Sequence, residues 1–141
     1  GKSKPCADFV SWMSMAPVVS ERARALIDYL VGSDVEFLRF HKLKGKSYFV
    51  MNVLRCEDYL DKERSDFTEF HERYIFKLDL PKSLPPIFKC SDHWDEIFVT
   101  AQFAEMMVAN KLTGAALADP SEPTMPLILA NAEINRYPGV V

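Results

Sequence analysis

Cysteine and glycine are scarce in this chain, and their scarcity excludes several kinds of site. The three cysteines among 141 residues lie far apart and form no C-x-x-C pair, so we expect neither a disulfide framework nor a thiolate zinc site. This use of cysteine fits a reducing compartment such as the cytoplasm. The five glycines form no phosphate-binding loop, and the motifs G-x-S-x-G and H-E-x-x-H are missing.

Long apolar runs and a strong net charge are also missing. No run approaches the length of about 18 residues that a membrane span needs, and no signal peptide is visible, so we expect no membrane partner. A formal net charge of −3 offers no basic face for nucleic-acid phosphates, so we expect no nucleic-acid partner either.

Residues that could carry catalysis or hold a metal are few. Cys90 and His93, with His71 elsewhere, come closest to a metal cluster or to a thiol nucleophile with its base. The sequence shows no second half of a metal site and no known nucleophile motif around Cys90. We therefore expect no metal, no cofactor and no catalytic residue. An enzyme of unrecognised type that uses Cys90, His93 or His71 is the alternative.

Apolar residues make up 48% of the chain, and their spacing predicts a small α+β domain. Two stretches, 17–38 and 97–117, share a strand–helix–strand pattern. Ser20 and Thr100 are the expected N-caps, whose hydroxyls accept a hydrogen bond from the first helical turn. Asn110 is expected to end the second helix in a left-handed conformation. We expect both short helices to pack on one shared sheet, since neither is stable alone.

Further strands are predicted between and around these two units. Residues 47–55 are apolar on both faces and predict a central strand. The basic stretch before it, at 41–46, is either a solvated hairpin turn or a basic contact patch. Residues 74–80 and 87–90 predict two more strands, and 91–96 a polar connection. The expected sheet is mostly antiparallel or mixed and is flanked by the two short helices.

The domain organisation is expected to be simple. Residues 1–118 predict a single α+β domain. Residues 119–141 are rich in proline and predict an arm that packs on the same domain. Within that arm, 127–130 could dock as one more strand or as a helical turn.

The most highly charged stretch covers residues 56–73 and contains several aromatic side chains. It carries seven acidic residues against three basic ones. One interpretation is a solvated loop with one helical turn. The other is an acidic, aromatic surface for a basic partner.

Several phrases of the chain, taken in order, are similar to a known protein family. They are PVVSERARALIDYL with VEFLRF, GKSYFVMNVLRCEDYLD, YIFKLDL, PPIFKC and EIFVTAQFAEMMVANKLTGAAL, and together they span roughly residues 17–118. Their order resembles a bacterial family of polymorphic-toxin immunity proteins, the one numbered eleven, first described as a domain of unknown function. The phrase from Tyr48 to Asp61 carries most of the resemblance, followed by the phrase from Ile97 to Gly114.

The resemblance implies a cytoplasmic protein without a catalytic site that binds and neutralises a cognate toxin domain. An acidic surface would speed association with a basic toxin. The stretch 57–72 is therefore the predicted partner-binding surface, with the site residues Asp58, Asp61, Asp66, Phe67, Glu69 and Phe70. Asp58 and Asp61 lie inside the resembling phrase, so capping a helix or turn is their alternative role. A general interaction module of a larger chain is a further alternative, and the oligomeric state is left open.

Overall fold

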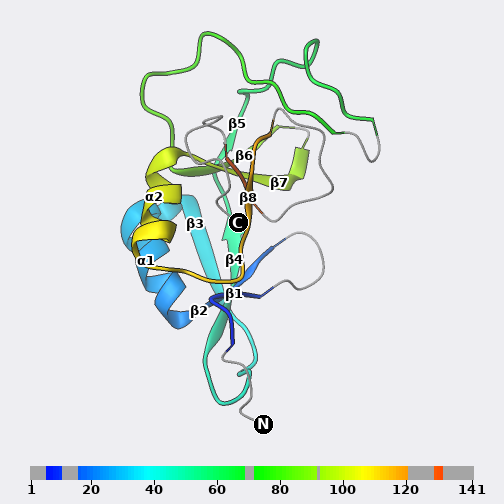
Figure 1. Cartoon of the computed structure of the whole chain (residues 1–141). Helices are drawn as coiled ribbons and strands as arrows, with labels where there is room; N and C mark the ends of the chain where they lie inside the picture. The colour runs from blue at the N-terminus through cyan, green and yellow to red at the C-terminus, as the bar shows by residue number, and fades with distance from the viewer. Residues whose placement is uncertain (1–5, 11–15, 69–71, 92, 121–128, 132–141) are drawn as a thin grey trace.

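Two small β-sheets and two short α-helices form an α+β fold in this computed structural model, which describes residues 6–10, 16–68, 72–91, 93–120 and 129–131. Both helices lie on the same side of the sheets (Figure 1). One sheet has the strand order β1-β2-β4-β3 and the other β5-β6-β7-β9-β8. The predicted fold class, with antiparallel and mixed sheets, is confirmed.

The first sheet is entirely antiparallel. Its strands are β1 (Phe9–Val10), β2 (Val18–Ser20), β3 (Val35–Arg39) and β4 (Tyr48–Val53), and α1 (Glu21–Val31) connects β2 to β3 through a short 3-10 turn. The strand β4 is an inner strand between β2 and β3, as its two apolar faces predict.

The second sheet is mixed. It contains β5 (Cys56–Glu57), β6 (Ile87–Cys90), β7 (His93–Val99), β8 (Leu117–Ala118) and β9 (Leu129–Asn131), and α2 (Ala101–Ala109) follows β7. The strand β9 lies between β7 and β8 and is parallel to both. The C-terminal arm therefore adds a strand close to where one was expected.

The two strand–helix–strand units are present, but they occupy separate sheets. In the first unit β2 and β3 flank β4, and in the second unit β7 and β8 flank β9. The expectation that both units pack on one shared sheet is wrong. A third strand lies between the two strands of each unit, β4 in the first and β9 in the second, so each unit belongs to its own sheet. What the units share is a hydrophobic core, in which Ile27 of α1 and Phe103 of α2 are both fully buried.

The helix ends follow local signals at α1 more closely than at α2. Ser20 is the N-cap of α1, and its hydroxyl accepts a hydrogen bond of 3.1 Å from the Ala23 N–H, as predicted. Thr100 is the N-cap of α2, but its buried hydroxyl finds no hydrogen-bond partner in the described chain. Asn110 has a φ of −97°, so the predicted left-handed end is wrong at that residue, and Lys111 adopts it instead with a φ of 50°.

Residues 74–80, predicted as a strand, form no strand. Their backbone groups bond to loop partners: the Tyr74 N–H donates to Pro120 and the Lys77 N–H donates to Tyr59. The alternation that suggested a strand reflects aromatic packing, since Tyr74 and Phe76 join an aromatic core beside the second sheet. The predicted connection at 91–96 is also wrong, because β7 already begins at His93.

The hairpin between β3 and β4 has the predicted basic turn. Leu43 and Lys46 form an antiparallel bridge around Lys44 and Gly45, whose φ values of 47° and 77° suit a tight hairpin. This turn lies at the end of the molecule opposite the loops between β5 and β6 (Figure 1).

The N-terminal segment is fixed to the end of the second unit. The Asp8 carboxylate accepts hydrogen bonds from Arg22, at 2.7 Å, and from the Thr113 N–H, at 3.1 Å. The Phe9 N–H donates to the Thr113 carbonyl at 2.9 Å. Gly114, with a φ of 91°, lets the two backbones approach so closely that a Cβ there would overlap the Phe9 carbonyl oxygen.

Candidate partner-binding surface

The predicted acidic residues lie in the loops beside the second sheet, and one of them, Asp61, has a structural task. Asp61 accepts hydrogen bonds from the N–H groups of Glu63 and Arg64, both at 3.1 Å, and so caps the turn at 62–64. This is the alternative role expected for Asp61. In place of the expected helical turn, the described part of 58–73 has this turn and isolated bridges, after the short strand β5.

Asp58 and Asp66 are exposed carboxylates in the same loops. Asp58 pairs with Lys77 at 3.2 Å, an exposed ion pair of small energetic value. Asp66 accepts hydrogen bonds from the N–H and the hydroxyl of Thr68 and bridges to Arg73 through the backbone. Both carboxylates are accessible to a partner, so their predicted binding role stays a prediction.

Phe67 lies half-buried against the aromatic core. Its ring centroid is 3.9 Å from that of His93 and 5.8 Å from that of Tyr74. Phe67 thus joins the charged loop to the start of β7. Glu69 and Phe70, the other two predicted site residues, lie outside the described residues, as does His71.

The start of β7 presents residues that sequence reasoning did not select. The Trp94 side chain is 64% exposed, which is unusual for the largest aromatic residue, and Asp95 beside it is also exposed. Exposed tryptophans are typical anchors of protein interfaces. Trp94, Glu96 and Phe98 are spaced by two residues, as on one face of a strand. This spacing could have extended the strand predicted at the start of 97–117 back to Trp94.

Glu96 is buried at the same place, with only 4% of its surface exposed. Burial raises the pKa of its carboxyl to about 8, and the negative charges of Asp95 and Glu72 add to this effect. A buried carboxyl that stays protonated near neutral pH marks a functional-site candidate.

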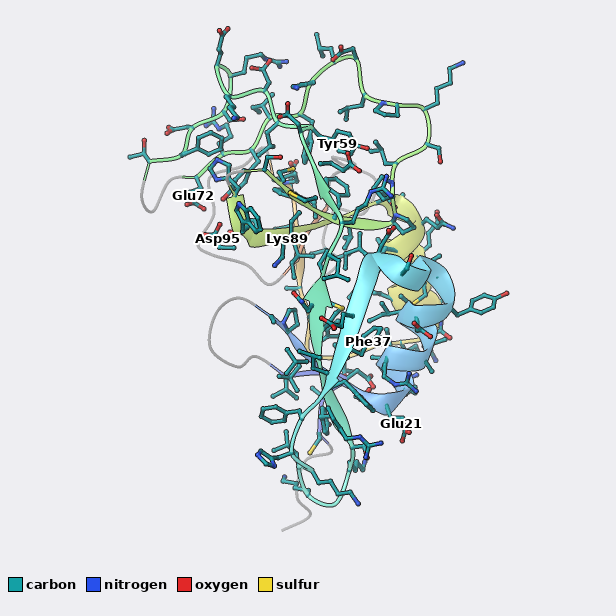
Figure 2. All side chains as sticks on the ribbon, turned by 180° about the vertical axis from the view of Figure 1, so that it is seen from behind. Glu21, Phe37, Tyr59, Glu72, Lys89 and Asp95 are labelled. Atoms are coloured by element: carbon teal, nitrogen blue, oxygen red, sulfur yellow. The ribbon has the colours of Figure 1, made fainter. Side chains whose placement is uncertain are left out.

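Tyr74 is hydrogen-bonded to one of these carboxylates, that of Glu72. Its hydroxyl donates a hydrogen bond of 2.6 Å to the Glu72 carboxylate. Burial, this hydrogen bond and the charge of Glu96 raise the pKa of the Tyr74 hydroxyl. In Figure 2, Glu72 and Asp95 are both labelled in the half of the molecule away from Glu21 of α1. We give the name acidic face to Asp66, Phe67, Glu72, Trp94 and Asp95, which belong to the charged loop and to the start of β7.

Cys90, the candidate nucleophile of the enzyme alternative, is buried in this structure. Cys90 and His93 are directly opposite each other on β6 and β7, but Cys90 is buried in the aromatic core. Burial raises the pKa of the Cys90 thiol to about 12, so the reactive thiolate is disfavoured. Within the described residues, no group of three or more His, Cys, Asp or Glu side chains is arranged to hold a metal ion.

A comparison with models of known protein families and with curated proteins gave no match. The resemblance to the immunity family therefore rests on the sequence phrases given above. Among the described residues, neither helix has the length and apolar character required to cross a membrane.

Proposed function

We propose that this chain is an immunity protein that binds a cognate bacterial toxin domain in the cytoplasm and neutralises it through the acidic face. The observation that carries the proposal is the exposed Trp94 beside Asp95, next to the charged loop that contains Asp66. The ordered phrases from Tyr48 to Asp61 and from Ile97 to Gly114, which resemble an immunity family, support it independently.

The physical basis of this proposal is a rigid scaffold with a complementary surface. A protein that inhibits its partner by binding needs a stable fold and a few anchor residues at the centre of its interface. Aromatic residues contribute most of the binding energy there. Trp94 provides such an anchor on β7, and the same strand is held in the core by the buried Ile97 and Phe98. Negative charge around it would raise the association rate with a basic toxin and make that rate salt-dependent.

The test is neutralisation of a toxin encoded beside this gene. The toxin domain is expressed in a host cell with or without this chain, growth is measured, and the affinity of the purified pair is determined. We expect growth to be restored, and we expect Trp94→Ala to weaken binding by roughly 30-fold or more. Tyr29→Ala is the matched control, since Tyr29 is a 94% exposed aromatic residue on α1, away from the acidic face.

Two results would contradict the proposal. One is that no toxin domain encoded next to the gene is bound or neutralised by the chain. The other is that the charge reversals Asp66→Lys and Asp95→Lys leave both affinity and association rate unchanged, which would exclude the acidic face as the binding surface.

A further inference from the structure

We propose that two copies of this chain pair through the edge strand β3, antiparallel to each other and about a two-fold axis at Leu38. The pairing would join the two first sheets into one continuous sheet. This inference goes beyond the immunity function, since it uses the first sheet and the acidic face belongs to the second.

The first observation is that β3 is the only long edge strand of the two sheets in the described chain. The other edge strands, β1, β5 and β8, have two residues each, whereas β3 has five. Very short edge strands are one of the ways in which proteins prevent two sheets from pairing edge to edge. The strand β3 lacks this protection, and it contains neither a proline nor a bulge.

The second observation is that part of the β3 backbone points away from β4. The Phe40 N–H donates a hydrogen bond of 2.9 Å to the Tyr48 carbonyl. Bonded pairs alternate along an antiparallel ladder, so the even-numbered residues of β3 bond to β4 in the same way. The N–H and carbonyl groups of Phe37 and Arg39 therefore point to the edge, where the described chain offers them no backbone partner.

The third observation is an apolar row that crosses the first sheet and ends at Leu38. Val10, Val18, Val50 and Leu38 lie opposite one another on successive strands, so they share one face. Val18 is fully buried, whereas Leu38 at the edge is 48% exposed. A further strand with an apolar side chain beside Leu38 would continue the row and cover it.

The charges along this segment favour a second copy as that further strand. The segment begins with the acidic Asp34 and Glu36 and ends with the basic Arg39 and Lys42. In an antiparallel pair the acidic start of each copy lies beside the basic end of the other, whereas a parallel pair would place like charges together. The segment is therefore complementary to itself, as a two-fold interface requires.

The same side chains select the register of the pairing. A two-fold axis at Phe37 would place Glu36 of one copy against Leu38 of the other, and an axis at Arg39 would place two arginines opposite each other. An axis at Leu38 brings two leucines together. It also lets Phe37 of each copy exchange two backbone hydrogen bonds with Arg39 of the other.

The first test is the mass of the chain in solution, measured by sedimentation equilibrium over a range of concentrations. We expect a monomer–dimer equilibrium that weakens as salt is added, because opposite charges contribute to it. Leu38→Lys replaces an apolar contact by two like charges at the axis, so it should raise the dissociation constant roughly tenfold or more. Leu78→Lys changes a 92% exposed leucine outside β3 and is the matched control, which should dimerise like the unchanged chain.

The second test is a disulfide cross-link that reports the register. Two Cα atoms opposite each other in a non-hydrogen-bonded antiparallel pair are about 4.5 Å apart, which a disulfide can span. Leu38→Cys should therefore give a covalent dimer on mild oxidation, seen by non-reducing electrophoresis. Glu36→Cys lies on the same face two residues from the axis and should not, and the unchanged chain measures the background of the exposed Cys56.

Three results would overturn the inference. The first is a chain that stays monomeric up to about 1 mM, and the second is a dimer that Leu38→Lys does not weaken or that cross-links equally well at positions 36 and 38. The third is slower amide exchange at Phe37 and Arg39 only when a different protein is added. That result would show that the edge accepts a strand from another partner and not from a second copy.

Discussion

Raising the pH should destabilise the folded chain through a single buried carboxyl, that of Glu96. Burial and the neighbouring Asp95 and Glu72 raise the pKa of this carboxyl from 4.5 to about 8. Between these two pH values the folded chain keeps a proton that the unfolded chain has released. The contribution of Glu96 to stability is therefore full below about pH 4.5 and is lost as the pH rises toward 8.

The size of this effect follows from the pKa difference. The folded and unfolded values differ by 8 − 4.5 = 3.5 units, and each unit corresponds to about 1.36 kcal/mol, so the loss is on the order of 5 kcal/mol. A loss of this size is a large part of the total stability of a small domain. Glu96→Gln removes the ionisable group, so its unfolding free energy should exceed that of the unchanged chain above pH 8.

Urea unfolding followed by circular dichroism, at about pH 5 and about pH 9, measures the effect directly. From about pH 5 to about pH 9, the unfolding free energy of the unchanged chain should fall by several kcal/mol relative to that of Glu96→Gln. Glu63→Gln, an exposed change, should leave the pH dependence as it is. Parallel pH profiles for the unchanged chain and Glu96→Gln would refute the assignment of Glu96 as a buried, protonated acid.

Three further predictions concern the helix caps, a glycine and a thiol. Ser20→Ala should lower the unfolding free energy by about 1 kcal/mol, whereas Thr100→Val should cost nothing or stabilise, because only the first hydroxyl makes a capping bond; urea unfolding of both variants checks this. Gly114→Ala should cost roughly 3 kcal/mol or more in the same assay, against about 1 kcal/mol for Gly32→Ala, because a Cβ overlaps neighbouring backbone only at the first site. Brief alkylation of the native protein, read by peptide mass spectrometry, should leave Cys90 unmodified, since its thiol is buried with a pKa raised to about 12.

Short-range signals in the sequence predicted the helices and several strands correctly. The cap at Ser20 depends on residues within one helical turn, so the sequence pattern contains it. The inner position of β4 followed in the same way from its two apolar faces. The sequence pattern could not show which strands pair with which, because pairing depends on segments that are far apart in the chain.

The two wrong predictions around the second sheet have a common cause. Alternating aromatic residues at 74–80 suit a strand, but they equally suit a loop that inserts Tyr74 and Phe76 into an aromatic core. Glu96 resembled an exposed residue of a polar connection. Its burial beside Tyr74, and the charge of Glu72 that acts on it, are properties of the folded chain, so they could not be derived from local spacing.

The position of β9 between β7 and β8 has a consequence for folding during synthesis. All strands of the first sheet lie between residues 9 and 53, so that sheet can pair while the rest of the chain is still being made. The second sheet joins β8 to β7 only through β9, whose last residue is Asn131. The acidic face is built on β7 and its neighbouring loops, so on the ribosome it is expected to mature after the first sheet, once the inserted strand has been translated.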